Sequence, residues 1–298
     1  MPKTMSAQIL DGPLVASEVL EELREPLARL VAAGHTPRIA IVQIGGTPAT
    51  EAYTRGIRKN CEAVGIEVEL RTLSSEATER EVMRCFDETG ADPRITGVML
   101  QFPLPPHLDG RTLQSRIPPL KDVEAITPTC LGRLLLGESR VGPCTALATL
   151  KLLEKTGIEL RGAECVVVGM SDIVGKPSAL LLLDRFATTT VCHVETRHLA
   201  HHTRRADILV VATGRPHLIS ADMIKPGAAV IDIGYSRVEV RGENGEIRSE
   251  VRGDVVYSDA LDVAGWITPV PGGVGPVTRA MLLRNAVTAA LERSGLSA

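Results

Sequence analysis

Two glycines that could bind a pyrophosphate flank a turn in the middle of the chain. The stretch VVVGMSDIVGKPSALLLL, residues 166–183, passes from an apolar run through Gly169 and Gly175 into a leucine-rich segment. Ser171 or Asp172 could cap a helix there, and backbone N–H groups at the amino end of a helix bind phosphate. The spacing G-x-S-x-x-x-G differs from the G-x-G-x-x-G fingerprint of dinucleotide-binding proteins, so the same glycines also fit a plain connecting turn.

Two further stretches contain residues suited to a ligand site. In EAYTRGIRKN, residues 51–60, Tyr53 and Ile57 are four apart and would share one face of a helix. That face could be the wall of a reactive site or an ordinary apolar stripe. In WITPVPGGVGPVTRAMLLRNAV, residues 266–287, prolines stiffen a glycine-rich loop before an amphipathic helix. We interpret this loop as a wall that faces a ligand.

The elements that would position these residues alternate between strand and helix. Apolar runs at 38–46, 66–73 and 96–105 predict strands, and 48–65 and 77–90 predict helices. Thr47 is the expected cap of the first helix, and Gly65 lies just beyond its end. Four more buried-strand runs, at 164–169, 188–195, 206–214 and 228–234, have the spacing of βα units in a doubly wound parallel sheet. We therefore predict an α/β protein whose second domain, residues 146–272, is Rossmann-type.

Composition excludes several classes of protein. The 298 residues are 44% hydrophobic and 23% charged, as in ordinary globular proteins, and are enough for two domains. The net charge of −3 and the aromatic content of 2% argue against a nucleic-acid partner. The sequence has no apolar run long enough for a membrane helix and no signal peptide pattern, which predicts a cytoplasmic protein. The six widely spaced cysteines are expected to be reduced, buried thiols rather than disulfides or metal ligands.

Other reactive patterns are weak. His198, His201 and His202 have spacing that could hold a metal, but no acidic or cysteine ligand nearby completes a set, so we predict no metal site. A serine hydrolase would require a G-x-S-x-G elbow, which the sequence lacks.

Several motifs together resemble one known family. ITPVPGGVGPVT (267–278), QFPLPPH, PLKDVEAITP, GPCTA, VVVGMSDIVGKP and IKPGAAVIDIG occur in the order found in methylenetetrahydrofolate dehydrogenase/cyclohydrolases, the FolD family. The resemblance covers nearly the whole chain. It implies a folate-binding domain, residues 1–145 completed by the final helix 273–298, a cleft between this domain and the NAD(P)-binding one, and a homodimer.

The sequence departs from the family where the resemblance places the chemistry. The family helix carries Tyr-x-x-x-Lys, with the lysine as the principal group of the cyclohydrolase step; here Tyr53 is present and Ile57 occupies the lysine position. An aliphatic side chain can neither donate a hydrogen bond nor move a proton. Lys59 would lie about 200° around the helix from that position and cannot substitute. We predict weak or absent cyclohydrolase activity, while hydride transfer, which needs no proton acceptor, could survive alone.

The resemblance also assigns the remaining site residues. Gln101 would contact the folate or position Tyr53, and Glu124, where the family has aspartate, would hold the pterin amino edge. Ala125 and Ala146 replace residues usual in the family, which indicates either altered substrate preference or neutral drift. The proline-glycine loop would form the wall of the folate site through Pro269, Gly272 and Gly273.

Cofactor choice follows from the same comparison. NADP-dependent members place an arginine and a serine where this chain has Met170 and Val194, and Glu195 follows at the end of a strand. A carboxylate there would bind ribose hydroxyls and repel a 2′-phosphate, so NAD is favoured, although Arg197 could still bind NADP. The predicted dinucleotide contacts are Gly169, Met170, Ser171, Val174, Gly175, Val194, Glu195, Tyr235 and Thr278.

The expected activity is oxidation of methylenetetrahydrofolate to methenyltetrahydrofolate with NAD or NADP. Two alternatives remain from the sequence. One is a FolD-like paralog that acts on a different small substrate, and the other is a non-catalytic folate- or dinucleotide-binding protein.

Overall fold

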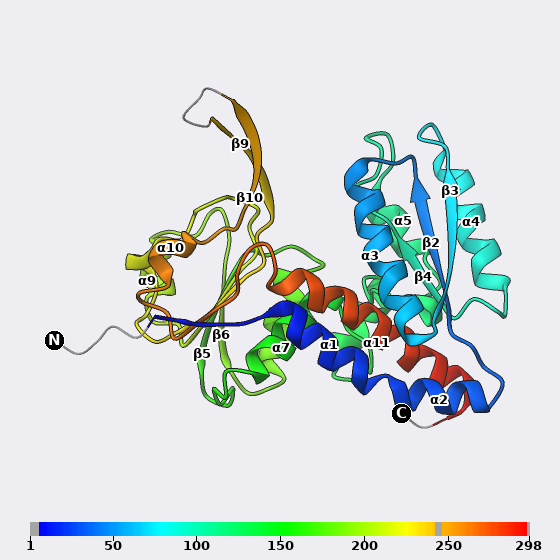
Figure 1. Cartoon of the computed structure of the whole chain (residues 1–298), viewed down its shortest axis with the longest axis horizontal. Coiled ribbons are helices and arrows are strands. Elements are labelled where there is room, and N and C mark those ends of the chain that lie inside the picture. Colours follow the sequence, from blue (N-terminus) through cyan, green and yellow to red (C-terminus); the bar gives the residue numbers. More distant parts are fainter. Residues whose placement is uncertain (1–5, 242–245, 297–298) are drawn as a thin grey trace. The chain divides into compact units, whose positions relative to one another are not determined.

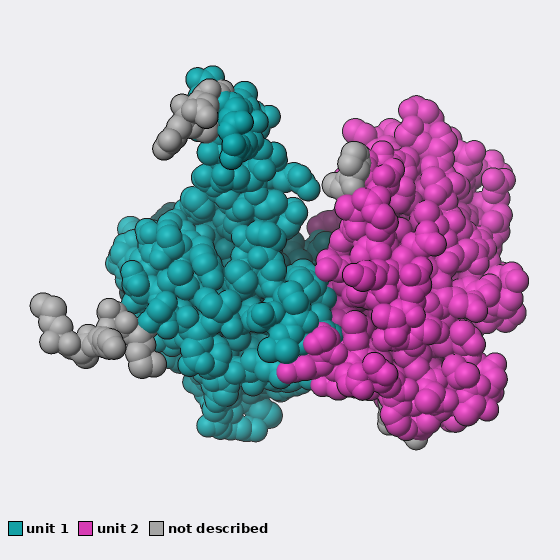
Figure 2. Space-filling view, in the orientation of Figure 1, with its two compact units in different colours: residues 1–16, 145–278 teal, residues 17–144, 279–298 magenta. Residues whose placement is uncertain are grey.

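The computed structural model describes residues 6–241 and 246–296 and divides into two compact units (Figure 2). Unit 1 comprises residues 1–16 and 145–278, and unit 2 comprises residues 17–144 and 279–298. The amino-terminal segment is thus grouped with unit 1, whereas the sequence suggested that residues 1–145 act together. The division into functional domains at residues 145 and 273 stays a prediction.

Unit 2 is built on a three-stranded parallel sheet with the order β3-β2-β4. The strands are β2 (Arg38–Ile44), β3 (Glu67–Leu73) and β4 (Gly97–Leu100). Helices α3 and α4 flank this sheet on opposite sides (Figure 1). The helices of this part of the chain are α2 (Arg24–Ala32), α3 (Pro48–Val64), α4 (Glu79–Ala91), α5 (Gly110–Arg116), the 3₁₀ helix η1 (Pro119–Lys121) and α6 (Pro128–Leu135).

Both predicted helices are present, and the sequence explains their ends, although α4 begins two residues later and ends one residue later than predicted. The Thr47 hydroxyl accepts from the Thr50 N–H at 3.2 Å at the start of α3, while the Thr50 hydroxyl accepts from the Thr47 N–H in return. Gly65 ends the helix in the left-handed conformation with φ of 81°. Thr78 and Glu81 form the same kind of reciprocal cap at the start of α4. Both helices therefore begin at a fixed point relative to the strand before them.

The core of unit 2 forms because alternate residues of β2 point to opposite faces of the sheet. Ala40, Val42 and Ile44 pack with Val82 and Phe86 of α4 in one apolar cluster. The intervening residues Ile39 and Ile41 are also fully buried. A parallel strand covered on both faces is expected to be apolar throughout, which is why RIAIVQI is a run without polar alternation.

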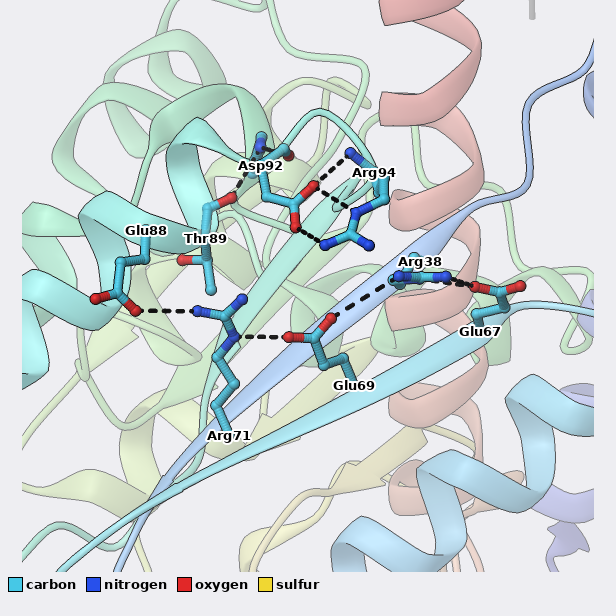
Figure 3. A network of polar contacts seen from close by, with 9 residues as sticks. Arg38, Glu67, Glu69, Arg71, Glu88, Thr89, Asp92 and Arg94 are labelled. Atoms are coloured by element: carbon cyan, nitrogen blue, oxygen red, sulfur yellow. Dashed lines mark hydrogen bonds and ion pairs between the residues drawn. The ribbon is translucent and has the colours of Figure 1, made fainter.

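The exposed edge strand β3 carries a chain of ion pairs (Figure 3). Arg71 lies between Glu69, at 2.8 Å, and Glu88 of α4, at 3.4 Å. Arg38 of β2 pairs with Glu67, and Arg94 pairs with Asp92 at 2.7 Å. Such surface pairs contribute little stability individually. Charged side chains along an edge do, however, prevent another strand from pairing with it.

Unit 1 contains a six-stranded parallel sheet with the order β1-β11-β8-β7-β5-β6. The four strands predicted for the Rossmann-type domain are all present. The sheet consists of β1 (Gln8–Ile9), β5 (Glu164–Val168), β6 (Thr188–Cys192), β7 (Ile208–Val211), β8 (Ala229–Asp232) and β11 (Trp266–Ile267). The chain leaves β5 on one side to form β6 and returns to the other side to form β7. This reversal is the switch point at which doubly wound sheets bind ligands.

Helices and an antiparallel hairpin complete unit 1. The hairpin pairs β9 (Ser236–Arg241) with β10 (Ile247–Arg252) and projects beyond the sheet (Figure 1). The helices are α7 (Cys144–Glu154), α8 (Gly175–Leu183), α9 (Leu199–Thr203), η2 (Ala221–Met223) and α10 (Tyr257–Ala260). Helices α1 (Gly12–Glu22) and α11 (Val274–Ser294) contain residues of both units.

Two global expectations can be compared with the described residues. All six cysteines are free and buried, as predicted. Within the described ranges, no helix is both long and apolar enough to cross a membrane.

Candidate functional site

Tyr53 and Gln101 lie at the carboxyl edge of the sheet of unit 2. Tyr53 is in the second turn of α3, which follows β2. Gln101 directly follows β4, and its backbone N–H donates to Val42 O of β2 at 2.9 Å. The Gln101 side chain is buried, and its Nε2 donates to Phe102 O at 2.7 Å. Parallel strands end at one edge of a sheet, and this topology brings the two predicted residues to the same edge.

Glu124 belongs to a loop that α11 holds in place. The Asn285 side chain donates from Nδ2 to Val123 O and to Gly142 O, both at 2.8 Å. The Cys144 thiol also donates to Val123 O at 3.5 Å. The sequence gave no sign of Asn285, because its partners are more than 140 residues away along the chain. Through these contacts the final helix fixes the backbone beside Glu124.

Burial dominates the electrostatics of this cluster. It raises the pKa of Tyr53 well above its usual value, and the carboxyl group of Glu124 adds to that effect. Burial, followed by the charge of Asp122, raises the pKa of Glu124 to about 8. The Cys144 thiol is affected by burial in the same way, so its pKa is raised well above the usual range. Near neutral pH the phenol, the thiol and most of the Glu124 carboxyl are therefore uncharged in the free protein.

Arg279 of α11 is a member of the cluster that sequence reasoning missed. Its stem lies against Gly56 of α3, where an added Cβ would be 3.4 Å from Nε and 3.5 Å from Cδ. Tyr53, Gly56 and Ile57 share one helix face, and Ile57 is fully buried. The guanidinium lowers the pKa of Tyr53, in opposition to burial and Glu124. A cation thus stands beside Tyr53 although position 57 is aliphatic.

Several buried polar atoms of unit 2 have no hydrogen-bond partner. They include Oε1 of Gln101, Oε2 of Glu124 and Nε of Arg279. Buried polar groups are nearly always paired, and each unpaired one costs about 1–3 kcal/mol. Three such atoms on the predicted site residues and on Arg279 are available to hydrogen-bond with a polar ligand.

The predicted pyrophosphate turn lies at the switch point of the unit 1 sheet. Gly169 follows β5 with φ of 122°, and an added Cβ would lie 2.2 Å from Ala212 O, just after β7. A Cβ on Gly175 would lie 2.1 Å from Gly169 O. Both positions therefore require glycine because backbone approaches backbone. The turn places the amino end of the nine-residue helix α8 at this edge of the sheet.

The cap of α8 differs from the one expected. Its N-cap residue is Val174, not Ser171 or Asp172, because a turn at residues 172–174 delays the start of the helix. The Ser171 hydroxyl nevertheless accepts from the Gly175 N–H at 3.3 Å, and Asp172 pairs with Lys176 at 2.6 Å. Ser171 therefore accepts a hydrogen bond from the first turn of α8 although it lies outside that helix.

The side chains expected to select the cofactor are exposed. Met170, Val194 and Tyr235 are 46%, 77% and 59% exposed, and Glu195 is also exposed. The Glu195 N–H donates to His193 Nδ1 at 3.2 Å, which fixes the backbone just beyond β6. Glu195 therefore follows the strand next to β5, on the edge that carries the glycine turn.

The proline-glycine loop is fastened within unit 1. The Gly12 N–H donates to Gly272 O at 3.0 Å, and Gly272 has φ of 106°. Gly273 is buried, Pro269 is partly exposed, and the Thr278 hydroxyl donates to Val274 O at 3.2 Å inside α11. Their predicted contacts with folate or dinucleotide stay predictions.

Two buried aspartates that the sequence analysis did not single out hold the neighbouring loops. Asp254 Oδ2 accepts from the N–H groups of Thr213, at 2.6 Å, and Gly214, at 3.0 Å. Asp232 Oδ1 accepts from the N–H of Gly234 at 2.9 Å, and burial raises the pKa of Asp232 to about 6. These bonds join the loops after β7, β8 and β10, which lie at the same edge as the glycine turn.

Comparison with known proteins matches both halves of the chain to one family. Residues 10–124 match the catalytic domain of tetrahydrofolate dehydrogenase/cyclohydrolase, and residues 143–294 match its NAD(P)-binding domain. The chain is 47% identical over 286 residues to the bifunctional protein FolD of Moorella thermoacetica, covering 96% of this chain and 99% of the relative. This chain belongs to the tetrahydrofolate dehydrogenase/cyclohydrolase family.

Solved structures of the family agree with that assignment. The Trypanosoma brucei methylenetetrahydrofolate dehydrogenase-cyclohydrolase, complexed with NADP cofactor and inhibitor, is 36% identical, with a TM-score of 0.90 and 100% of both chains covered. A 5,10-methylenetetrahydrofolate dehydrogenase from the silkworm is 34% identical, with a TM-score of 0.89, covering 97% of this chain and 99% of that one. The family resemblance seen in the sequence is confirmed, as is the α/β fold with a Rossmann-type domain.

Membership of the tetrahydrofolate dehydrogenase/cyclohydrolase family assigns the two sheet edges to different functional domains. The turn at Gly169 and Gly175 belongs to the NAD(P)-binding domain of the family, and Tyr53, Gln101 and Glu124 belong to its catalytic domain. Within the described residues, no group of three or more His, Cys, Asp or Glu side chains could hold a metal ion.

Proposed function

We propose that this protein oxidises 5,10-methylenetetrahydrofolate to 5,10-methenyltetrahydrofolate with a nicotinamide dinucleotide. The observation that carries the proposal is the cluster of unpaired buried atoms on Gln101, Glu124 and Arg279 beside Tyr53. In a family of folate enzymes, these atoms fit a heterocycle that carries both N–H donors and acceptor atoms. The glycine turn at the switch point fits the dinucleotide.

Hydride transfer requires little covalent chemistry from the protein. The methylene C–H bond breaks with both electrons leaving as hydride, and a nitrogen lone pair forms the C=N bond of the methenyl cation. When bound, the nicotinamide ring accepts that hydride. No proton leaves in this step, so the residues must chiefly orient two flat rings at reacting distance. Tyr53 would form one wall, and Glu124 and Gln101 would hold the pterin edge.

We propose that cyclohydrolase activity is weak or absent. Addition of water to the methenyl carbon must be followed by loss of a proton, and the family's lysine is absent because Ile57 occupies its position. Arg279 does not replace the lysine in this respect, since a guanidinium stays protonated and has no acceptor atom. Tyr53 is held neutral by burial. Since Glu124 is engaged with the pterin edge in this proposal, neither Tyr53 nor Arg279 offers the attacking water an efficient proton acceptor.

For the cofactor we propose NAD in preference to NADP. Exposed Met170 and Val194 offer no group for a 2′-phosphate, and the exposed carboxylate of Glu195 would repel one. Arg197 is exposed nearby and supplies the opposite charge. The ratio of kcat/KM for the two dinucleotides measures the preference. We also propose a homodimer, which sedimentation equilibrium would test.

A steady-state assay tests the proposed function. Purified protein is supplied with 5,10-methylenetetrahydrofolate and either NAD or NADP, and reduced cofactor and methenyltetrahydrofolate are followed separately. We expect equal amounts of both products, with methenyltetrahydrofolate decaying no faster than in buffer. No reduced cofactor with either dinucleotide would overturn the dehydrogenase proposal. In that case, tetrahydrofolate binding separates a non-catalytic binding protein from a paralog recruited to another substrate.

A further inference from the structure

The cation beside Tyr53 belongs to the final helix α11 and not to α3. The family's lysine would come from α3 itself, whereas Arg279 reaches Tyr53 from the final helix α11. The small residue at position 56 leaves room for the arginine stem, because a Cβ there would lie 3.4 Å from Nε, in ordinary contact. A larger residue at position 56 would occupy the path of that side chain.

The Nε atom of Arg279 is buried and makes no hydrogen bond within the protein. Other arginines of unit 2 have carboxylate partners, such as Arg71 with Glu69 and Arg94 with Asp92. An unpaired charged donor is unfavourable in the free protein unless a ligand pairs with it. Two unpaired acceptors are Oε2 of Glu124, whose charge also acts on Tyr53, and Oε1 of Gln101, which follows Leu100, a backbone partner of Glu124.

We propose that Arg279 binds the folate substrate, donating through its guanidinium to an acceptor oxygen of the pterin ring. This inference rests on the proposed function. One buried donor and two buried acceptors match the edge of a pterin, which carries a carbonyl oxygen beside N–H groups. Arg279 keeps a positive charge next to Tyr53 but cannot take up a proton. The site therefore retains substrate binding by a cation and loses the proton transfer that an amine would allow.

Equilibrium binding of tetrahydrofolate tests the assignment without requiring catalysis. We expect Arg279→Met to raise the Kd for tetrahydrofolate about 10- to 100-fold, as for loss of a charge-assisted hydrogen bond, and Arg279→Lys to restore part of the affinity. Arg284→Met is the matched control, because Arg284 is an exposed arginine on the same helix and should leave the Kd unchanged. The dinucleotide Kd, which reports on unit 1, should be the same in all four proteins.

Gly56→Leu provides an independent test that leaves α11 intact. The new side chain would lie where the Arg279 stem runs, so it should displace the guanidinium and raise the Kd for tetrahydrofolate by a similar factor. Thermal unfolding of each variant shows that the protein is folded. If the wild type does not bind tetrahydrofolate, the proposed function itself fails. If the wild type binds and Arg279→Met binds within twofold of it, the assignment of Arg279 is wrong while the proposed function stands.

A double variant adds a readout that a structural role would not affect. Ile57→Lys alone should yield little cyclohydrolase activity, because repulsion from the guanidinium would turn the new ammonium away from the site. Ile57→Lys with Arg279→Met removes that repulsion, and we expect kcat for methenyltetrahydrofolate hydrolysis, measured at saturating substrate, to be at least tenfold higher than with Ile57→Lys alone. Equal rates in the single and double variants would contradict a cation at this position.

Discussion

Glu124→Gln should change both the stability and the folate affinity of the protein in a way that depends on pH. Burial and Asp122 raise the pKa of Glu124 from 4.5 to about 8, and its Oε2 is unpaired. In the free protein at neutral pH the carboxyl group is therefore mostly protonated. Glutamine has the same shape and no charge, so it imitates the protonated form at every pH.

The effect on stability follows from proton linkage. Between pH 4.5 and about 8 the folded protein holds a proton on Glu124 that the unfolded chain has released. The contribution of this group to stability is thus complete below pH 4.5 and declines as pH rises to about 8. The whole interval corresponds to at most about 5 kcal/mol. Glu124→Gln should therefore match the wild type at pH 5 and be more stable at pH 8.5.

Ionisation of Glu124 has the opposite effect on tetrahydrofolate binding, which should strengthen as the pH rises. If the pterin N–H groups pair with the ionised carboxylate, binding must release the Glu124 proton. Below the pKa of about 8 the ionised fraction falls about tenfold for each pH unit, so the Kd for tetrahydrofolate should weaken by about that factor between pH 7 and pH 6. Glu124→Gln should bind more weakly at pH 8 and show no such slope.

Two measurements decide the matter. Urea unfolding of both proteins at pH 5 and pH 8.5 gives the difference in stability, and calorimetry in two buffers of different ionisation enthalpy counts the protons released on tetrahydrofolate binding. We expect close to one proton released by the wild type at pH 7 and none by the variant. A pH-independent stability difference together with equal proton release would refute the assignment of a protonated Glu124.

Three further substitutions test the positioning of the site. Gly169→Ala should abolish dinucleotide binding, measured by fluorescence titration, and cost more than about 3 kcal/mol, since its Cβ would lie 2.2 Å from Ala212 O. Asn285→Leu should cost about 2–3 kcal/mol in urea unfolding, because two buried carbonyls lose the donors now at 2.8 Å. Gly56→Ala should raise the free energy of unfolding by about 0.5–1 kcal/mol through helix propensity, with the methyl group in ordinary contact with Arg279.

The sequence predicted those parts of the fold that depend on local patterns. The strands β2 to β8, the Thr47 cap and the Gly65 end of α3 follow from apolar runs and terminal residues, and all are present. The two-residue strand β1 could not be predicted, because it exists only through pairing with β11, more than 250 residues later. The start of α8 was also misplaced, since a turn after Ser171 is not visible in residue types alone.

In the candidate site, too, residues within local motifs could be predicted, whereas residues that act through distant contacts could not. Tyr53, Gln101 and Glu124 were identified from motifs, whereas Arg279 and Asn285 were not. Both lie on α11, and their roles depend on contacts with residues more than 140 positions earlier. In the sequence Arg279 is one polar residue of an amphipathic helix, and only the packing of that helix against Gly56 places it in the site. The missing amine at position 57 stays a prediction from the family resemblance, whereas the cation near Tyr53 could not be predicted from the sequence.

Positions 57 and 279 are physically linked, which explains why an aliphatic residue suits the lysine position here. Two positive charges held about 5 Å apart at an effective dielectric constant near 20 repel each other by about 3 kcal/mol. With a guanidinium over Gly56, a lysine at position 57 would be unfavourable, whereas isoleucine there is fully buried and contributes packing. Hydride transfer does not depend on a lysine at position 57, because it requires a bound, oriented substrate and no proton acceptor. Water addition requires a proton acceptor, so we propose that residues 57 and 279 together separate the two activities in this protein.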